Sequence, residues 1–411
     1  MSDTKRILEE YEYYQPQEML APVKDDSTRL RIGIPKEIVP YENRVPLRPG
    51  AVEVLRNNGH EIIIQTGAGQ LSKHNDQDYS EAGGQIVYSA KQVFESADIL
   101  LKVAPPTLEE LEWMQSGKTL ISALQPATVK RELLQKILDK RLTALGYELL
   151  KDSAGNLSIM RAMSEIAGSS IVLIAAEYLN STNNGRGMII GGITGVTPAN
   201  IVILGAGTVG EYAARTALHL GGNVKIFDND IHKLRRTKYN LGNPNLYTSI
   251  LDTETLNEAL ERADVAIGAL SPVRGRTPVV VTEEMVSRMR PDAVIVDVSI
   301  DHGGCFETSE PTTHARPIFR KYDVIHYCVP NIPSRVARTA TSAISNVFTP
   351  MLLQIAEHGD IESMIADEPS FCEGVYAFNG AITNENISDK FRLRYKDINL
   401  LMAARRGRKN S

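Results

Sequence analysis

Residues 198–230 read PANIVILGAGTVGEYAARTALHLGGNVKIFDND, and this stretch decides the fold. An apolar strand is predicted over residues 201–204, and it runs directly into GAGTVG. A helix is predicted over residues 211–220, and a second strand over residues 224–227 ends at Asp228. A GxGxxG turn between a strand and a helix, with an acidic residue about 20 positions further on, is the fingerprint of a dinucleotide-binding βαβ unit.

Each part of this fingerprint has a physical task. Gly205 permits the tight turn, Gly207 lets a pyrophosphate approach the backbone, and Gly210 lets the helix pack closely on the strand. The helix N-terminus offers N–H groups and a positive dipole end to the phosphates. Asp228 can accept hydrogen bonds from ribose hydroxyls and would repel a 2′-phosphate, so the sequence predicts NAD rather than NADP. The alternatives are a glycine-rich loop of an unrelated α/β protein and a simple turn role for Asp228.

The same alternation of strands and helices extends outward from this stretch. Upstream, the strand-like runs RLRIGIPKE, EIIIQTGAG, ADILLKVAPP, KTLISALQPA and RLTALGYELL are separated by helical runs such as VKRELLQKILDK. Downstream, ADVAIGAL, DAVIVDVSI and YDVIHYCV are further strands, and the chain becomes helical again after Pro330. This order predicts an α/β protein whose parallel sheets are covered by helices on both faces.

The bulk properties narrow the class of protein. The chain has 411 residues, enough for two or three domains, and a net charge of −5, which does not favour nucleic-acid binding. Three scattered cysteines fit a reducing, cytoplasmic protein rather than a disulfide framework or a zinc site. Residues 1–28 form a polar extension without the order of a signal peptide. No run of about 18 apolar residues is present, so no membrane span is expected.

Longer motifs show a family resemblance. The stretches GIPKEIVPYENRVPLRPGAVEVLRNNGH, MSEIAG, GGITGV, GAGTVG, VDVSIDHGGCFETSEPTTH and HYCVPNIP resemble alanine dehydrogenase, whose wider family contains the hydride-transfer subunit of nicotinamide nucleotide transhydrogenase. The resemblance implies two Rossmann-like, doubly wound domains. A discontinuous substrate domain would comprise residues 29–157 plus 337–411, and an NAD-binding domain residues 158–336. It also implies a homo-oligomer, typically a hexamer, with the substrate in the cleft between the domains.

The resemblance assigns candidate site residues. Asp301 matches the aspartate beside the nicotinamide and substrate, where a carboxylate can take up a proton or orient an ammonium group. Arg44 in ENRV matches the arginine that binds the substrate carboxylate through its guanidinium fork. Ser164 in MSEIAG matches a residue at the cofactor phosphates, and Asn331 in VPNIP one near the nicotinamide. The plainer alternatives are a loop cap for Asp301, a surface salt bridge for Arg44, a helix N-cap for Ser164 and a turn role for Asn331.

Two positions depart from the pattern of the family. Alanine dehydrogenases usually read LKVKEP, but this chain reads LKVAPP, so Ala104 replaces a substrate-binding lysine. Their acid/base histidine lies in a motif like LHLA, but here Gln125 stands in SALQPA and cannot exchange a proton near pH 7. Both departures resemble the transhydrogenase subunit. Lys102 shares a strand face with Ala104 and would reach the cleft, unless it is a structural lysine. His302 would replace the lost base, unless it is an exposed loop histidine.

The favoured hypothesis is the reversible, NAD-dependent oxidative deamination of L-alanine to pyruvate and ammonium. Its expected catalytic residues are Asp301, Arg44, Lys102, Gln125 and His302. No metal is predicted, because the His and Cys residues near Asp301 lack any ligand spacing. The alternatives are a transhydrogenase-like hydride transfer, a dehydrogenase of another small amino acid, and an NAD(H)-binding protein without catalysis.

Overall fold

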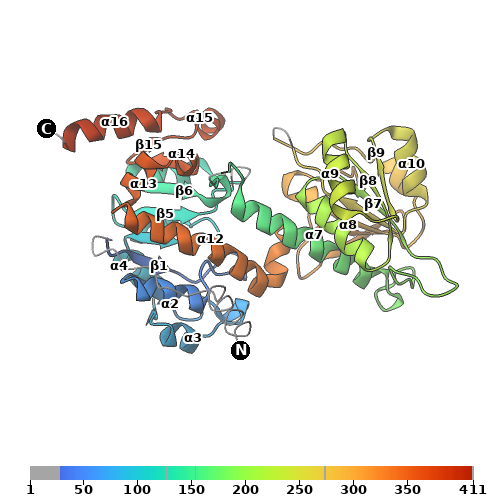
Figure 1. Cartoon of the computed structure of the whole chain (residues 1–411), viewed down its shortest axis with the longest axis horizontal. Helices are drawn as coiled ribbons and strands as arrows, with labels where there is room; N and C mark the ends of the chain where they lie inside the picture. Colours follow the sequence, from blue (N-terminus) through green and yellow to red (C-terminus); the bar gives the residue numbers. More distant parts are fainter. Residues whose placement is uncertain (1–27, 126–127, 153, 273–274, 410–411) are drawn as a thin grey trace, which may run out of the picture.

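The computed structural model describes residues 28–125, 128–152, 154–272 and 275–409, with side chains described up to residue 403. Apart from residue 28, the predicted polar extension lies outside the described residues. Figure 1 shows two α/β units, joined by the long helices α7 (Ser158–Leu179) and α12 (Ala337–Glu357).

The first unit is built on an eight-stranded sheet with the order β15-β14-β6-β5-β4-β1-β2-β3. Its strands are β1 (Arg31–Ile34), β2 (Glu61–Gln65), β3 (Gln85–Val87), β4 (Ile99–Leu101), β5 (Thr119–Ser122), β6 (Thr143–Gly146), β14 (Val375–Phe378) and β15 (Ala381–Ile382). Strands β1 to β6 pair in parallel, and β14 and β15 extend the sheet in antiparallel fashion. Because β14 and β15 come from the C-terminal part of the chain, this unit is discontinuous in sequence, as predicted.

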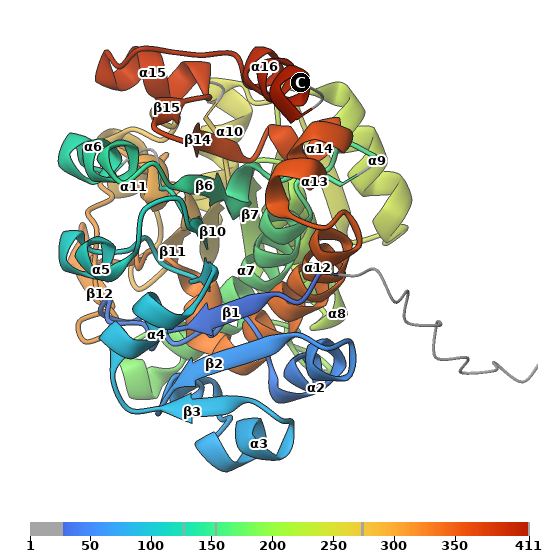
Figure 2. The same ribbon diagram turned by 90° about the vertical axis from the view of Figure 1, so that its left-hand side faces the viewer.

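Helices cover both faces of this sheet. They are α2 (Pro49–Asn57), α3 (Asp76–Glu81), α4 (Ala90–Ser96), α5 (Leu108–Trp113), α6 (Arg131–Asp139), α13 (Ile361–Asp367), α14 (Pro369–Cys372), α15 (Glu385–Phe391) and α16 (Ile398–Lys409). Figure 2 shows α4, α5 and α6 on one side of the sheet, and α2, α12 and α13 on the other. Neighbouring residues of β2 alternate between these layers: Ile62 and Ile64 lie in the core beneath α2 and α12, and Ile63 lies in the core beneath α4.

The second unit has a seven-stranded sheet with the order β12-β13-β11-β10-β7-β8-β9. Its strands are β7 (Asn200–Leu204), β8 (Asn223–Phe227), β9 (Leu246–Ser249), β10 (Val265–Gly268), β11 (Val294–Asp297), β12 (Ile318–Lys321) and β13 (Val324–Tyr327). Its helices are α8 (Thr208–His219), α9 (Ile231–Leu241), α10 (Thr253–Glu261) and α11 (Glu283–Ser287). All pairings are parallel except that of β12 with β13. Both units are therefore doubly wound, which confirms the predicted α/β fold.

The two sheets share one feature that positions a site. In the first sheet β1 lies between β2 and β4, and in the second β7 lies between β8 and β10. In each sheet the strand order therefore reverses beside the central strand, so neighbouring connections run to opposite sides. This opens a crevice at the carboxyl ends of the strands. In such sheets ligands bind at this edge, so binding residues are expected in the loops after β1, β4, β5, β7, β11 and β13.

Helix α7 belongs to both cores. Ile159 and Met163, near its start, pack in the core of the first unit, and Ile171 and Val172 pack with α8 in the core of the second. Among the described helices it alone is long and apolar enough to cross a membrane by length and composition. Its first turns serve one core and its later turns serve the other, which explains why it is apolar along most of its length.

Candidate active site

The glycine turn lies between β7 and α8, where each glycine meets a different environment. Gly205 has a φ of 107°, and an added Cβ there would stand 2.5 Å from the carbonyl oxygen of Ala269. An added Cβ at Gly210 would stand 1.8 Å from the carbonyl oxygen of Gly205. At Gly207, by contrast, nothing lies within 4 Å. Gly205 and Gly210 are thus required by packing, and Gly207 borders open space in which a phosphate would fit.

The start of α8 is prepared for an anion. The helix begins at Thr208, three residues before the predicted start, and no side chain caps its first turn. Its first N–H groups therefore remain available, and they carry the positive end of the helix dipole. This geometry fits the pyrophosphate of a dinucleotide.

Asp228 is buried at the end of β8 and holds the glycine turn in place. Its Oδ2 accepts a hydrogen bond from the N–H of Ala206 at 2.8 Å, and its Oδ1 accepts one from the N–H of Asp230 at 2.8 Å. A carboxylate has about four acceptor positions, so both oxygens can still accept from ribose hydroxyls. The residue thus shapes the turn, and the proposed contact with the ribose remains compatible with this geometry.

Ser164 lies well inside α7, so the alternative of a helix N-cap is wrong. One turn later, Gly168 lets α7 approach α8 so closely that an added Cβ would stand 2.4 Å from the carbonyl oxygen of Val209. Residues four apart share a helix face, so the half-buried Ser164 is on the side of α7 that faces the first turn of α8. This position is consistent with the predicted contact to the cofactor phosphates.

Replacing Gly207 with valine is expected to weaken NADH binding without unfolding the protein. The side chain would occupy the open space before α8 and displace the pyrophosphate from the N–H groups. Losing charge-assisted hydrogen bonds worth about 1.5–3 kcal/mol raises Kd about ten- to a hundredfold. Fluorescence titration with NADH measures this, and Gly50→Val is the matched control, because Gly50 also borders open space. An unchanged Kd in Gly207→Val would contradict the placement of the phosphates.

Arg44 lies in the loop after β1 and forms a buried ion pair with Glu42. Its Nε donates to Oε1 of Glu42 at 2.7 Å and its Nη2 to Oε2 at 2.6 Å, while Nη1 lies 3.4 Å from Sδ of Met163 on α7. Burial alone would lower the pKa of Arg44, but the hydrogen bonds and charge of Glu42 raise it above its usual value. Arg44 is therefore a permanently charged, buried cation, and the alternative of a surface salt bridge does not describe it.

Asn331 reaches the same pair from the second unit. It lies after β13, immediately before the short helix η5 (Ile332–Val336), with a φ of 55°. Its amide Nδ2 donates to Oε2 of Glu42 at 3.0 Å, across the boundary between the units. Asparagine tolerates this left-handed conformation better than most residues, so Asn331 also has the turn role that was its alternative. Asn331 is therefore both a turn residue and a direct partner of the arginine site.

Asp301 lies beside these residues, in the short helix η4 (Val298–His302) after β11. The surrounding protein desolvates its carboxylate and raises its pKa, while the charges of His302 and Arg44 and the N–H of Asn331 act in the opposite direction. Its side chain nevertheless keeps solvent-exposed surface, so the desolvation comes from crowding rather than from full burial. The structure thus brings Asp301, Arg44 and Asn331 together.

Asp297 is a residue whose importance the sequence analysis missed. It ends β11 in the core, and its carboxylate accepts hydrogen bonds from the N–H groups of Ser299 at 3.0 Å and Cys305 at 2.9 Å, and from the hydroxyl of Ser309 at 2.7 Å. These bonds fold the loop that carries Asp301 back over the strand end. Burial raises the pKa of Asp297 despite these donors. The available signal was a carboxylate inside an otherwise apolar strand, which requires buried donors.

Lys102 does not face the cleft, and this corrects the expectation that it reaches the substrate. It is fully buried, and its Nζ lies 3.0 Å from Oε2 of Glu37 and 3.0 Å from Oε1 of Glu110. Glu37 also accepts hydrogen bonds from the N–H groups of Val103 at 2.6 Å and Ala104 at 3.3 Å. Burial opposes the charge on Lys102, but the two carboxylates raise its pKa. The ammonium is therefore committed to a structural network.

Gln125 and His302 are both exposed. Gln125 follows β5 with a φ of 50°, and its N–H donates to Oε1 of Glu148 at 2.9 Å. Because β5 pairs in parallel with β4, this loop lies at the same sheet edge as Ala104. His302 lies next to Asp301, and its carbonyl accepts a hydrogen bond from the N–H of Thr277 at 2.9 Å. Neither side chain has a contact that assigns it to catalysis, so both roles stay predictions.

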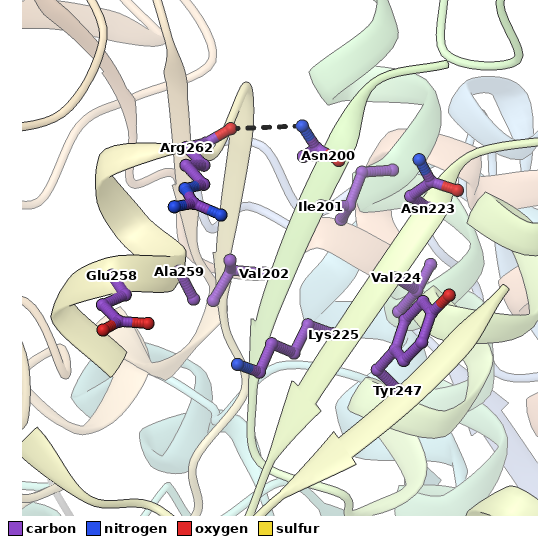
Figure 3. A pocket seen from close by; sticks show the side chains of 10 residues that line it. All are labelled: Asn200, Ile201, Val202, Asn223, Val224, Lys225, Tyr247, Glu258, Ala259 and Arg262. Carbon is purple, nitrogen blue, oxygen red and sulfur yellow. Dashed lines mark hydrogen bonds between the residues drawn. The ribbon is translucent and has the colours of Figure 1, made fainter. Parts of the chain in front are cut away.

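A groove elsewhere on the second unit takes no part in this site. It has a volume of about 270 Å³ and lies at the amino ends of β7 and β8, beside α10 (Figure 3). Its lining includes Asn200, Lys225, Tyr247, Glu258 and Arg262. The glycine turn lies at the opposite, carboxyl end of the same strands. In the described part of the chain, no cluster of three or more His, Cys, Asp and Glu residues could hold a metal ion.

Comparisons with known proteins agree with this arrangement. An alanine dehydrogenase of Mycolicibacterium smegmatis is 38% identical over 374 residues, which cover 90% of this chain and 100% of that protein. An alanine dehydrogenase of Bacillus subtilis is 38% identical over 358 residues, covering 87% of this chain and 93% of that protein. A solved L-alanine dehydrogenase, 35% identical, has a TM-score of 0.82 and covers 88% of this chain and 99% of its own.

The family assignment covers both units. A transhydrogenase from Sinorhizobium meliloti has the same fold, with a TM-score of 0.74 at 24% identity over 86% of this chain and 99% of its own. Residues 33–167 match the N-terminal domain of the alanine dehydrogenase/PNT family, and residues 171–385 match its C-terminal domain. The two matches together span more than half of the chain, and with the identities above they establish that it belongs to the alanine dehydrogenase/PNT family.

Proposed function

We propose that this protein is an NAD-dependent alanine dehydrogenase. The reaction is L-alanine, NAD⁺ and water to pyruvate, ammonium, NADH and a proton, and it is reversible. The observation that carries the proposal is the convergence of Arg44 from the first unit with Asp301 and Asn331 from the second, at the carboxyl ends of both sheets. The identity of about 38% to alanine dehydrogenases over most of the chain supports it.

The residues present fit NAD. The open space at Gly207 and the uncapped start of α8 suit the pyrophosphate, and Asp228 suits the adenosine ribose. When bound, NAD⁺ accepts a hydride from the substrate Cα. The protein has to orient the substrate and move protons.

Arg44 is proposed to bind the substrate carboxylate. Glu42 occupies the Nε/Nη2 edge of its guanidinium, and the Nη1/Nη2 edge has only the weak acceptor sulfur of Met163. A carboxylate on that free edge would form two parallel charge-assisted bonds. The substrate amine would then lie towards the second unit, where Asp301 is found.

Asp301 is proposed to handle protons at the amine. Its carboxylate would take a proton from the substrate ammonium, directly or through water, before the Cα–H bond breaks. After passing that proton on to solvent, the carboxylate would stabilise the positive iminium and assist the addition of water to the C=N bond. The raised pKa of Asp301 suits a group that must both accept and return a proton. Gln125 would only hydrogen-bond the carbonyl, and His302 would relay protons to solvent.

A homo-oligomer in the cytoplasm is proposed as the working state, with a hexamer implied by the family resemblance. The segment after α7 supports association, since Ile189 is 66% exposed, Ile193 69% and Val196 58%. Neighbouring exposed apolar side chains of this kind typify an interaction surface. Light scattering tests the proposal: a particle mass of 45.3 kDa, that of one chain, would contradict it.

The proposed function is tested by NADH oxidation with pyruvate and ammonium. Turnover is expected to require both compounds, and Gln125→His is expected to accelerate it, because histidine restores an acid/base group worth about 10²- to 10⁴-fold. NADH binding without turnover on any 2-oxo acid would contradict the proposal and favour a non-catalytic binding protein. Turnover on a different 2-oxo acid would change the substrate. Hydride exchange between NADH and an NAD⁺ analogue without pyruvate would favour the transhydrogenase-like alternative, which Ala104 and Gln125 suggest.

A further inference from the structure

We infer that Glu42 is a positioning residue, which sets the orientation of Arg44 and couples it to Asn331 across the boundary between the two units. The inference rests on the proposed function, in which Arg44 binds the substrate carboxylate. It goes further by assigning the geometry of that contact to the carboxylate of Glu42.

The carboxylate of Glu42 is surrounded by donors. Its Oε1 accepts from Nε of Arg44 at 2.7 Å and from the backbone N–H of Arg44 at 3.1 Å. Its Oε2 accepts from Nη2 of Arg44 at 2.6 Å and from Nδ2 of Asn331 at 3.0 Å. Glu42 is only 5% exposed, so these four donors replace its water. Burial would raise the pKa of Glu42, but the hydrogen bonds and charge of Arg44 lower it below its usual value.

This arrangement leaves one edge of the guanidinium for the substrate. A guanidinium can bind a carboxylate at the Nε/Nη2 edge or at the Nη1/Nη2 edge. Glu42 holds the first edge, so the second, which carries Nη1, faces Met163 on α7. Glu42 also balances the charge of Arg44, and Ala104 supplies no second cation. The binding of a carboxylate therefore depends on the direction of the free edge rather than on excess positive charge.

The loop that carries Glu42 is bonded to the segment that follows Asn331. The N–H of Asn43 donates to Oγ of Ser334 at 2.9 Å, and the N–H of Val45 donates to Oγ1 of Thr341 at 3.1 Å. The hydroxyl of Ser334 donates to the carbonyl oxygen of Tyr41. These contacts join the loop after β1 to η5 and the start of α12. The substrate arginine thus belongs to the same frame as the cofactor-side asparagine.

Glutamine at position 42 is the sharpest test, because every neighbour of the carboxylate is a donor. The amide NH₂ of Glu42→Gln would face the donors of Arg44 and Asn331, and the guanidinium would turn away. We expect KM for pyruvate to rise and kcat to fall, together about ten- to a hundredfold in kcat/KM, the effect of a small misplacement at a reacting centre. The Kd for NADH is expected to change much less than kcat/KM, because the glycine turn that binds the phosphates is not altered.

A reciprocal exchange supplies the matched control. In Glu42→Gln with Asn331→Asp, the new amide donates to the new carboxylate, so the polarity of the bond between the units is reversed and the total charge is kept. Aspartate tolerates the left-handed backbone at position 331. The double variant is expected to recover part of the lost kcat/KM, whereas Asn331→Asp alone places two carboxylates together and lowers it. A role of Glu42 in stability alone would lower the melting temperature and leave KM unchanged.

The outcomes separate this inference from the proposed function. Wild-type kcat/KM in Glu42→Gln would overturn the positioning role, and a double variant no better than its worse parent would overturn the coupling. If the wild type shows no turnover, the proposed function fails, and the coupling is then read from the melting temperatures of the two single variants and the double variant. If the changes in melting temperature of the two single variants simply add up in the double variant, the coupling is overturned too. If Glu42→Gln does not fold, Asn331→Ala tests it, because an unchanged KM for pyruvate would exclude a coupling through Asn331.

Discussion

Replacing Asp301 with asparagine is expected to lower kcat for alanine oxidation by about 10²- to 10⁴-fold, the usual contribution of an acid/base group. Asparagine has the same shape and can still accept the hydrogen bond from the N–H of Asn331, but it cannot take up a proton. The wild-type rate should fall as the pH decreases through the raised pKa of Asp301, because the protonated carboxyl no longer accepts a proton. This fall of the rate at low pH should be absent in Asp301→Asn. Stopped assays of NADH formation from alanine across pH measure both effects.

The matched control for this change is Asp139→Asn. Asp139 is an exposed residue at the end of α6, where its carboxylate accepts a hydrogen bond from Gln135, and asparagine can still accept that bond. Both variants are expected to bind NADH and to melt like the wild type. If Asp301→Asn retains the wild-type kcat, Asp301 does not handle protons, and another group such as His302 must do so.

Replacing Lys102 with methionine is expected to destabilise the first unit by about 3–5 kcal/mol, the usual cost of removing one partner from a buried ion pair. The carboxylates of Glu37 and Glu110 would remain buried without a cation. Burial already raises the pKa of Glu37 even with Lys102 present, so in the variant Glu37 is expected to become protonated near neutral pH. The free energy of unfolding from urea titration measures the loss.

The control for this prediction neutralises the whole network. Lys102→Met combined with Glu37→Gln and Glu110→Gln is expected to regain most of the stability, because each glutamine oxygen can keep its backbone contacts. In particular, glutamine still completes the capping box that Glu110 forms with Thr107 at the start of α5. A normal stability of Lys102→Met, together with a raised KM for pyruvate, would contradict the structural role and return Lys102 to the substrate.

The core of the second unit could be predicted because its signals are local. The order of strand, glycine turn, helix and strand from β7 to β8 depends on residues within one continuous stretch, and the contacts of Gly205 and Gly210 are made inside that unit. Strands β3, β9, β12, β14 and β15 were not predicted. Four of them are edge strands and β14 lies next to an edge, and all are two to four residues long, which is too short for a clear periodicity.

The site shows the same division between local and long-range information. The motifs located Arg44, Asp301 and Asn331, and the structure brings these residues together from two units. The sequence predicted that Lys102 and Ala104 share a strand face, but β4 ends at Leu101 and both residues follow it, and the sequence could not tell what lies opposite Lys102. Glu37 and Glu110 lie there, and they arrive from separate elements. The hydrogen-bond partners of Asp297 in the following loop could not be predicted for a similar reason, since they depend on how that loop folds back.

The sequence by itself determined the α/β class, the dinucleotide turn at Gly205–Gly207–Gly210 with Asp228, and the family resemblance. These depend on the order of residues along the chain, which sets local conformation and burial period. Only the tertiary structure decided that Arg44 is held by Glu42, that Asn331 joins them from the other unit, and that Lys102 is confined between two carboxylates. Glu42 is only two residues from Arg44, but Asn331 is 289 residues from Glu42 and Glu37 is 65 from Lys102, so these buried charges find all their partners only once both sheets and the helices between them are in place.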